Sequence, residues 1–173
     1  GARIYVLWYD NSSSSLYRST DGGTSWLPAV TLPYVPQSPV LAVGQAGTIL
    51  RAPDGNDDWS VPPSSTSHWL RGVCFGGADD AWAVGRYGTV LHSSDAGATW
   101  SPQASGSLVY LYATAFAGPG KGWATGYNGT ILRTANGGET WKKQSSGTRS
   151  GLLGVSCIDG SRAWAVGQNG AIV

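Results

Sequence analysis

The chain has 173 residues, with 26 Gly, 9 Trp and 12% charged residues, and its formal net charge is +1. This balance gives no general attraction to nucleic acid or to anionic membrane surfaces, so we expect neither as a partner. High Gly and Trp content with few charges favours strands joined by tight turns over helices. No run of about 18 apolar residues is present, so we expect no direct membrane insertion by this segment.

The first 39 residues predict a pair of strands followed by an irregular stretch. Residues 3–9 and 16–20 are rich in β-branched and aromatic side chains and flank a polar loop at 10–15. Residues 19–26 then read Ser-Thr-Asp-Gly-Gly-Thr-Ser-Trp, a tight turn closed by Trp. Three Pro residues between 32 and 39 stand where later units carry a strand. We expect either an abbreviated unit there or residues absent from the sequence.

From Val43 onward one string recurs every 41 residues. Its full form, residues 84–100, holds a short apolar piece, a Gly-x-x-Gly turn, an alternating strand, an Asp-x-Gly turn and a closing Thr-Trp. The string returns at 125–141, and its first part occurs at 43–51 and at 166–173. Each regular unit supplies four short strands, and a period of about 40–45 residues is typical of a β-propeller blade.

The repeat predicts an all-β fold, a β-propeller of four-stranded antiparallel blades with 41-residue repeats. The predicted units are approximately 1–33, 34–66, 67–107, 108–148 and an incomplete 149–173. We expect about four blades of a larger ring of six to eight; a self-contained four-bladed ring is the alternative. Trp82, Trp123 and Trp164 occupy one repeat position and are predicted to be equivalent core residues. Cys74 and Cys157 fall two blades apart and are expected to be unpaired thiols.

The turn strings carry a family resemblance. The pattern Ser-x-Asp-x-Gly-x-Thr-Trp resembles the Asp-box, also called the bacterial neuraminidase repeat, which implies a hairpin turn at the propeller periphery. In such a turn a short side chain accepts backbone N–H bonds, while the Trp covers the hairpin. The positions that match are Asp21, Trp26, Asp54, Trp59, Asp95, Trp100, Asn136 and Trp141. Asn136 departs from the Asp of the pattern. We expect these residues to be structural.

A longer pattern is more specific. From Gly122 to Ser156 the chain reads Gly-Trp-Ala-x-Gly-x-x-Gly-Thr-Ile-Leu-Arg-Thr, then Gly-Gly-x-Thr-Trp, Gln-Ser-Ser-Gly-Thr and Leu-x-Gly-Val-Ser. This resembles the photosystem II stability and assembly factor family and its bacterial relatives, over about residues 41–173. The resemblance implies an exported, extracytoplasmic protein that binds a membrane protein complex and is not an enzyme. Residues 1–33 look more like an Asp-box blade of the kind found in xyloglucanases and sortilin-type receptors.

The residues themselves assemble no catalytic, cofactor or metal site. A glycosidase needs two carboxylates across the scissile bond, and each acidic residue here is assigned to a turn or to the Ser-rich loop. His68 and His92 are too few for a His-based metal site. We therefore expect no cofactor.

Basic and aromatic residues form the candidate partner-binding set. Arg residues at one repeat position would form an arc on one rim suited to carboxylates. Tyr residues at the Gly-x-x-Gly turns would add contact area. The set is Arg18, Arg51, Arg71, Arg86, Arg133, Tyr87 and Tyr127. The alternative is that these are solvated strand-edge residues.

The sequence thus predicts a non-catalytic protein-binding or scaffold module, with a membrane protein complex as the foremost partner. The first alternative is a carbohydrate-active propeller, either a glycoside hydrolase whose catalytic blades lie outside this chain or a sugar-binding module. The second is a repetitive surface protein that spaces other domains. A carboxylate pair on inner strands would favour the enzyme, and an Arg/Tyr rim without such a pair would favour the binder.

Overall fold

The computed structural model describes residues 4–9, 14–19, 39–53 and 58–173, and the chain divides into two compact units, Gly1–Pro36 and Gln37–Val173. In the first unit β1 (Ile4–Tyr9) pairs antiparallel with β2 (Ser14–Ser19). This hairpin is described through its backbone alone. It agrees with the two strands predicted around the Ser-rich loop.

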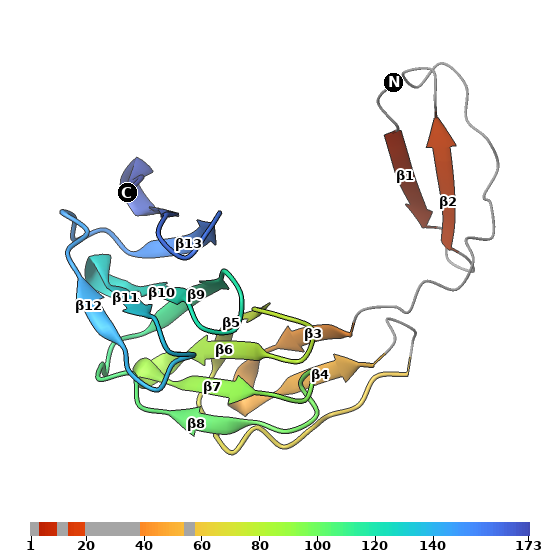
Figure 1. Cartoon of the computed structure of the whole chain (residues 1–173), viewed down its shortest axis with the longest axis horizontal. Coiled ribbons are helices and arrows are strands. Elements are labelled where there is room, and N and C mark those ends of the chain that lie inside the picture. Colours follow the sequence, from red (N-terminus) through yellow and green to blue (C-terminus); the bar gives the residue numbers. More distant parts are fainter. Residues whose placement is uncertain (1–3, 10–13, 20–38, 54–57) are drawn as a thin grey trace. The chain divides into compact units, whose positions relative to one another are not determined.

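The second unit consists of consecutive antiparallel sheets in which each strand pairs with its sequence neighbours (Figure 1). Two sheets have four strands each, in the orders β5-β6-β7-β8 and β9-β10-β11-β12. Two further sheets have two named strands each, β3-β4 and β13-β14. The bounds are β3 (Val40–Val43), β4 (Ile49–Ala52), β5 (Leu70–Phe75), β6 (Ala81–Gly85), β7 (Val90–Ser93), β8 (Ser101–Gln103), β9 (Leu111–Phe116), β10 (Gly122–Gly126), β11 (Ile131–Thr134), β12 (Lys142–Gln144), β13 (Leu152–Cys157) and β14 (Ala163–Gly167).

A short 3-10 turn follows each of the strands β3, β6, β10 and β14. The four turns are η1 (Gln45–Gly47), η2 (Arg86–Gly88), η3 (Tyr127–Gly129) and η4 (Gln168–Gly170). The last Gly of each turn has a positive φ, a conformation in which Gly is free of the Cβ penalty. A Cβ at Gly88 would also clash with the carbonyl oxygen of Ser107. The regular Gly spacing therefore reflects both backbone conformation and close packing.

Neighbouring sheets approach one another through their first strands. Strand β9 lies between β5 and β13, and β5 also contacts β3. The Trp82 ring of β6 stacks on Phe116 of β9, with centroids 3.6 Å apart and planes at 7°. Trp82 also donates from Nε1 to the carbonyl oxygen of Gly137 at 3.1 Å. Trp82 therefore packs onto the sheet that follows its own sheet in the chain.

The Trp residues that close the Asp-x-Gly turns pack in the opposite direction. Trp100 shares a buried cluster with Ile49 of the preceding sheet. Trp141 packs against a cluster that includes Val84 and Val90 of its own preceding sheet. The junction between the two four-stranded sheets is therefore filled from both sides, by Trp82 from the first sheet and Trp141 from the second.

The predicted fold class is confirmed: the described chain is all-β, with antiparallel four-stranded sheets of propeller type. The unit boundaries and the number of blades in a complete ring stay predictions. The predicted abbreviated unit near 32–39 falls almost wholly outside the described residues, as do Asp21, Trp26 and Asp54.

The predicted equivalence of Trp82, Trp123 and Trp164 as core residues is wrong. Trp82 and Trp123 are 0% and 4% exposed, as expected of core residues, but Trp164 is 46% exposed. Trp164 lies on β14, and no aromatic ring of the described residues stacks on it as Phe116 stacks on Trp82. Trp59 is also 46% exposed.

Candidate binding site

Because every strand pair is antiparallel, the connections fall at two opposite ends of the sheets. Leu70 pairs with Gly85, and Val90 pairs with Gln103, so these residues mark one end. Phe75 pairs with Ala81, and Ala81 with Ser93, at the other end. We call the first end the Gly-x-x-Gly rim; its segments are 44–48, 61–69, 85–89, 104–110, 126–130, 145–151 and 167–171. We call the second end the Asp-x-Gly rim; its described segments are 53, 58–59, 76–80, 94–100, 117–121, 135–141 and 158–162.

Charge is segregated between the two rims. In the described part of the chain every acidic residue lies on the Asp-x-Gly rim, namely Asp58, Asp79, Asp80, Asp95, Glu139 and Asp159. The Gly-x-x-Gly rim carries Arg86, Arg149 and His68 and, within the same described residues, no Asp or Glu. One end of these sheets is thus suited to acidic partners.

Arg86 is held between two aromatic rings on the Gly-x-x-Gly rim. Its guanidinium carbon lies 4.1 Å from the centroid of the Trp69 ring and 5.2 Å from that of Tyr110. Its backbone N–H donates to the Trp69 carbonyl oxygen at 2.9 Å. Arg71 approaches the same Trp69 ring at 5.6 Å. Such cation–π contacts orient the guanidinium.

Arg86 has no carboxylate partner among the described residues. The only ion pairs there are His92 with Asp80 and Arg162 with Asp159, both on the Asp-x-Gly rim. The buried Nε of Arg86 also lacks a hydrogen-bond partner. A fixed cation without a protein counterion is a candidate for binding an external carboxylate.

Tyr87 occupies the left-handed region of backbone space. Its φ is +56°, whereas the same repeat position holds Ala46, Asn128 and Asn169. A bulky residue in this conformation costs on the order of 1–2 kcal/mol. Tyr87 is 52% exposed, and its ring meets His68 and Tyr110 edge-on, with centroids 5.0 and 5.6 Å apart. This strained residue is half exposed and lies outside the buried core.

The candidate residues do not all come together. Arg71, Arg86, Tyr87 and Tyr127 lie at or next to the Gly-x-x-Gly rim. Arg51 and Arg133 lie near the Asp-x-Gly rim instead, at the far ends of β4 and β11. The phase-matched Arg51 and Arg133 therefore share one end of the sheets, whereas the other described members of the set lie at the opposite end. Of Arg18 only the backbone, on β2, is described.

Arg51 and Arg133 bond to the next sheet in the chain. Arg51 Nε donates to the Ala96 carbonyl oxygen at 2.8 Å, and Arg133 Nη2 donates to that of Gly160 at 2.8 Å. Arg133 also lies over the Trp123 ring at 5.5 Å. These two residues hold neighbouring sheets together, which reduces their availability to a partner.

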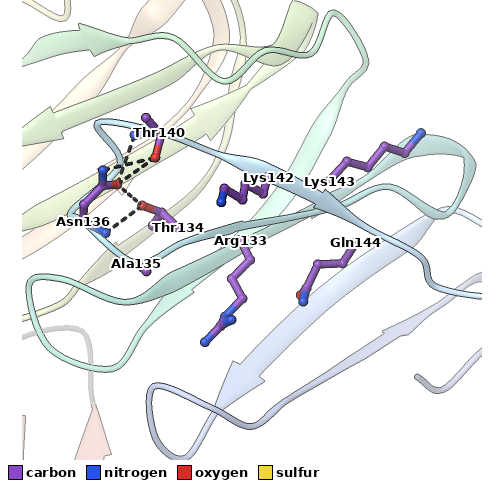
Figure 2. Close-up of a pocket in the computed structure, with 8 residues that line it drawn as sticks. All are labelled: Arg133, Thr134, Ala135, Asn136, Thr140, Lys142, Lys143 and Gln144. Atoms are coloured by element: carbon purple, nitrogen blue, oxygen red, sulfur yellow. Dashed lines mark hydrogen bonds between the residues drawn. The ribbon is translucent and has the colours of Figure 1, made fainter.

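A hollow of about 430 Å³ lies beside Arg133. Figure 2 shows Arg133, Lys142, Lys143 and Gln144 around it, from β11 and β12. In the preceding sheet the matching Gln103 donates from Nε2 to the Gly137 carbonyl oxygen of the following sheet at 2.8 Å. In the preceding sheet, the surface that matches this hollow is covered by the turn that follows β11. The basic lining of the hollow is therefore not by itself a sign of a ligand site.

The Asp-x-Gly turns use their acidic and amide side chains internally. Asp95 accepts from the Thr99 backbone N–H at 2.8 Å and from the Thr99 hydroxyl at 2.6 Å. These bonds lower the pKa of Asp95 to about 2, the Thr99 hydroxyl being the largest cause. Asn136 accepts from the same groups of Thr140 at 3.1 and 3.3 Å. The turn thus needs an acceptor at this position and does not need a charge.

The Asp-x-Gly rim also holds a His–Asp pair. His92 Nε2 lies 2.9 Å from Asp80 Oδ1, and the His92 ring stacks on Trp82 with centroids 4.6 Å apart. His92 is half-buried and lines a hollow of about 370 Å³. No group of three or more His, Cys, Asp or Glu side chains in the described residues is placed to hold a metal ion.

Cys74 and Cys157 are both unpaired, as predicted. Burial raises the pKa of the Cys74 thiol to about 12. The pKa of Cys157 is also raised, again chiefly by burial. Thiols with raised pKa values are poor nucleophiles and metal ligands at neutral pH, so neither marks a reactive site.

Sequence reasoning missed several members of the Gly-x-x-Gly rim cluster. Trp69, Tyr110 and Leu108 lie in the linkers that join one sheet to the next, outside the repeated Trp and Asp-x-Gly strings. The available signal was the presence of large apolar side chains in otherwise polar Ser/Gly-rich linkers. Leu108, which is 84% exposed, is the clearest case.

Comparison with solved structures supports the β-propeller fold. YCF48 bound to D1 peptide aligns with 20% identity and a TM-score of 0.54, over 82% of this chain and 41% of that protein. YCF48 from Cyanidioschyzon merolae aligns with 17% identity and a TM-score of 0.63, over 91% and 62%. An ancestral GH74 enzyme aligns with 16% identity and a TM-score of 0.59, over 96% and 28%.

This chain therefore spans between 28% and 62% of the length of these three neighbours. No protein-family model matches it, and no curated protein sequence matches it. None of the helical turns in the described residues is long and apolar enough to cross a membrane. At these levels of identity the three neighbours establish a shared propeller fold.

Proposed function

We propose that this chain is a non-catalytic propeller module that binds a segment of another protein through its Gly-x-x-Gly rim. The observation that carries the proposal is the composition of this rim. Exposed Tyr87 and Tyr127 and the stacked Arg86 gather at an end of the sheets that has no acidic residue in the described chain. Tyr and Arg are the residue types most enriched at protein interfaces.

Similarity to YCF48 supports this proposal, since one of those structures holds a bound D1 peptide. A membrane protein complex as the partner, an accessory or assembly role and an extracytoplasmic location are parts of the same proposal. They rest on the sequence resemblance and on this fold likeness. A role that needs neither metal nor cofactor is consistent with a rim built from Tyr, Trp and Arg.

Affinity purification of the chain from its native source, with mass spectrometry of the retained proteins, tests the proposal. The Tyr87→Ser/Tyr127→Ser variant should lose stoichiometric partners that the unmodified chain retains. Lys121→Gln, an exposed change on the Asp-x-Gly rim, is the matched control and should retain them. Equal retention by all three proteins would contradict binding through the Gly-x-x-Gly rim.

A carbohydrate-active propeller is the second candidate function, favoured by the likeness to a GH74 enzyme. Several carboxylates on the Asp-x-Gly rim are already engaged: Asp95 with Thr99, Asp159 with Arg162 and Asp80 with His92. A glycosidase would need two carboxylates that face its substrate. Release of reducing sugar from β-glucans by the isolated chain would favour this second candidate over the first.

A further inference from the structure

A groove on the Gly-x-x-Gly rim lies between the two four-stranded sheets. It encloses about 370 Å³ and is lined by Tyr87, Leu108, Val109, Tyr110, Tyr112 and Tyr127. The linker between β8 and β9 supplies three of these residues, and the η2 and η3 turns supply Tyr87 and Tyr127. The groove is thus built from both sheets and from the connection between them.

The groove is held in shape by backbone contacts that repeat along the chain. Gly88 N–H donates to the Val109 carbonyl oxygen at 2.7 Å, and Tyr127 N–H donates to that of Tyr110 at 2.8 Å. On one side His68 Nδ1 lies 2.8 Å from Thr89 Oγ1, and the His68 ring supports Tyr87. A site with its walls fixed in this way loses little entropy when a ligand binds.

The lining chemistry favours an apolar side chain over a sugar. It contains no Asp, Glu, Asn or Gln, so the hydroxyl groups of a sugar would meet only Tyr hydroxyls and backbone groups. Leu108, Tyr127 and Tyr87 are 84%, 57% and 52% exposed, so covering them would remove substantial apolar surface from water. An aliphatic or aromatic side chain is the occupant that fits.

Arg86 lies at the edge of this groove, because its guanidinium packs over the ring of the lining residue Tyr110. It has no carboxylate partner in the described chain, and none of the described acidic residues shares its rim. The charge complement of the groove is therefore a carboxylate next to the apolar side chain.

We infer that the groove binds an extended acidic protein segment. One apolar side chain of this segment occupies the space between Tyr87, Leu108 and Tyr127, and a neighbouring Asp or Glu carboxylate bonds to Arg86. The inference rests on the proposed protein-binding function and adds the partner's chemistry to it. The recognition unit is an apolar residue with an acidic residue close to it in sequence.

Selection of a phage-displayed library of random dodecapeptides on the intact chain tests the inference. Enriched peptides should combine an aliphatic or aromatic residue with a nearby Asp or Glu. Affinity of a synthetic enriched peptide should fall about tenfold for Arg86→Gln, the loss expected for one charge-assisted hydrogen bond. Tyr127→Ala should weaken the same peptide by a similar factor.

Two controls keep the result interpretable. Arg162→Gln removes an exposed Arg from the Asp-x-Gly rim and should leave affinity unchanged. Arg86→Lys keeps the positive charge but loses the planar guanidinium group. Its affinity for the peptide should therefore lie between those of the unmodified chain and Arg86→Gln. Circular dichroism of each variant shows whether it is folded. Tyr127→Ala changes a mostly exposed side chain and provides a second test if Arg86→Gln disturbs the stack on Trp69.

The outcomes separate this inference from the proposed function. Enriched peptides without a preference for Asp or Glu, or with unchanged affinity for Arg86→Gln, would overturn the inference. They would still support the proposed protein-binding function. Displacement of an enriched peptide by xyloglucan oligosaccharides would overturn it in favour of a sugar site. Failure to enrich any peptide over the bare support would contradict both the inference and the proposed function.

Discussion

The four-stranded sheet β5–β8 and the two-stranded sheet β13–β14 share a repeat but differ in burial. Trp82 in the first is fully buried between its own sheet and Phe116, whereas Trp164 in the second is nearly half exposed. Val84 is likewise buried, while the matching Val166 is 50% exposed. The same residues at the same repeat position therefore gain their burial from the adjacent sheet. In this fold the junction between sheets is the unit of stability.

Replacement of Trp82 should give the largest effect. Trp82→Ala removes a fully buried ring and its bond to Gly137, and we expect a loss of about 3–5 kcal/mol in unfolding free energy. Trp123→Ala should cost nearly as much, since Trp123 is almost fully buried. Urea unfolding followed by circular dichroism measures both.

Trp164→Ala is the matched comparison at the exposed junction. We expect a loss below about 1 kcal/mol, because much of this ring is already in water. Equal losses for Trp82→Ala and Trp164→Ala would show that the junction does not decide the contribution of this position.

Two turn glycines give the next largest difference. Gly88 and Gly170 both have positive φ, near +70°, but a Cβ at Gly88 would strike the Ser107 backbone, whereas one at Gly170 meets nothing within 4 Å. Both substitutions should lower the free energy of unfolding by about 1–2 kcal/mol, because a side chain is strained at positive φ. Gly88→Ala should lower it by about 1–3 kcal/mol more, because its Cβ overlaps the Ser107 backbone. Thermal unfolding of both variants makes the comparison, and identical shifts in Tm would refute it.

The smallest effect concerns the Asp-x-Gly turns, where Asp95 and Asn136 make matching bonds. The pKa of Asp95 is lowered on folding to about 2, so its carboxylate stabilises the folded state above pH 4 and loses that contribution as the pH falls toward 2. Asp95→Asn keeps an acceptor but cannot titrate. The stability difference between the two proteins should be about 0.5–1 kcal/mol near pH 6, because solvent screens this exposed group, and should disappear as the pH falls through 2.

Urea unfolding at several pH values tests the sign of this effect. A difference that grows as the pH falls would mean that the pKa of Asp95 is raised on folding. The natural Asn at position 136 offers the reciprocal control, because Asn136→Asp should introduce the same dependence there.

The sequence was sufficient to predict the repeat, the four-stranded sheets and the burial of Trp82 and Trp123, because these depend on local patterns that recur at a fixed period. It could not predict the exposure of Trp59 and Trp164, since burial there depends on a neighbouring sheet. The repeat position of a residue indicates which neighbouring sheet its side chain faces, and contact with that sheet decides whether the side chain is buried.

The candidate site was predicted less well, for a related reason. Repeat phase placed Arg51 and Arg133 together as partner-binding residues, yet both bond to the backbone of an adjacent sheet. Arg86, Tyr87 and Tyr127 were found because they are basic or aromatic residues within the Gly-x-x-Gly turns that the repeat makes visible. Leu108 and Tyr110 lie in variable linkers, and only the folded chain brings them beside those turns.

Hydrogen–deuterium exchange of the intact chain, with and without a selected peptide, tests protein binding at the Gly-x-x-Gly rim most directly. We predict slower exchange in segments 85–89, 104–110 and 126–130 when the peptide is bound. Segments 76–80, 117–121 and 158–162 on the opposite rim should be unchanged. Protection confined to those opposite segments would contradict the account.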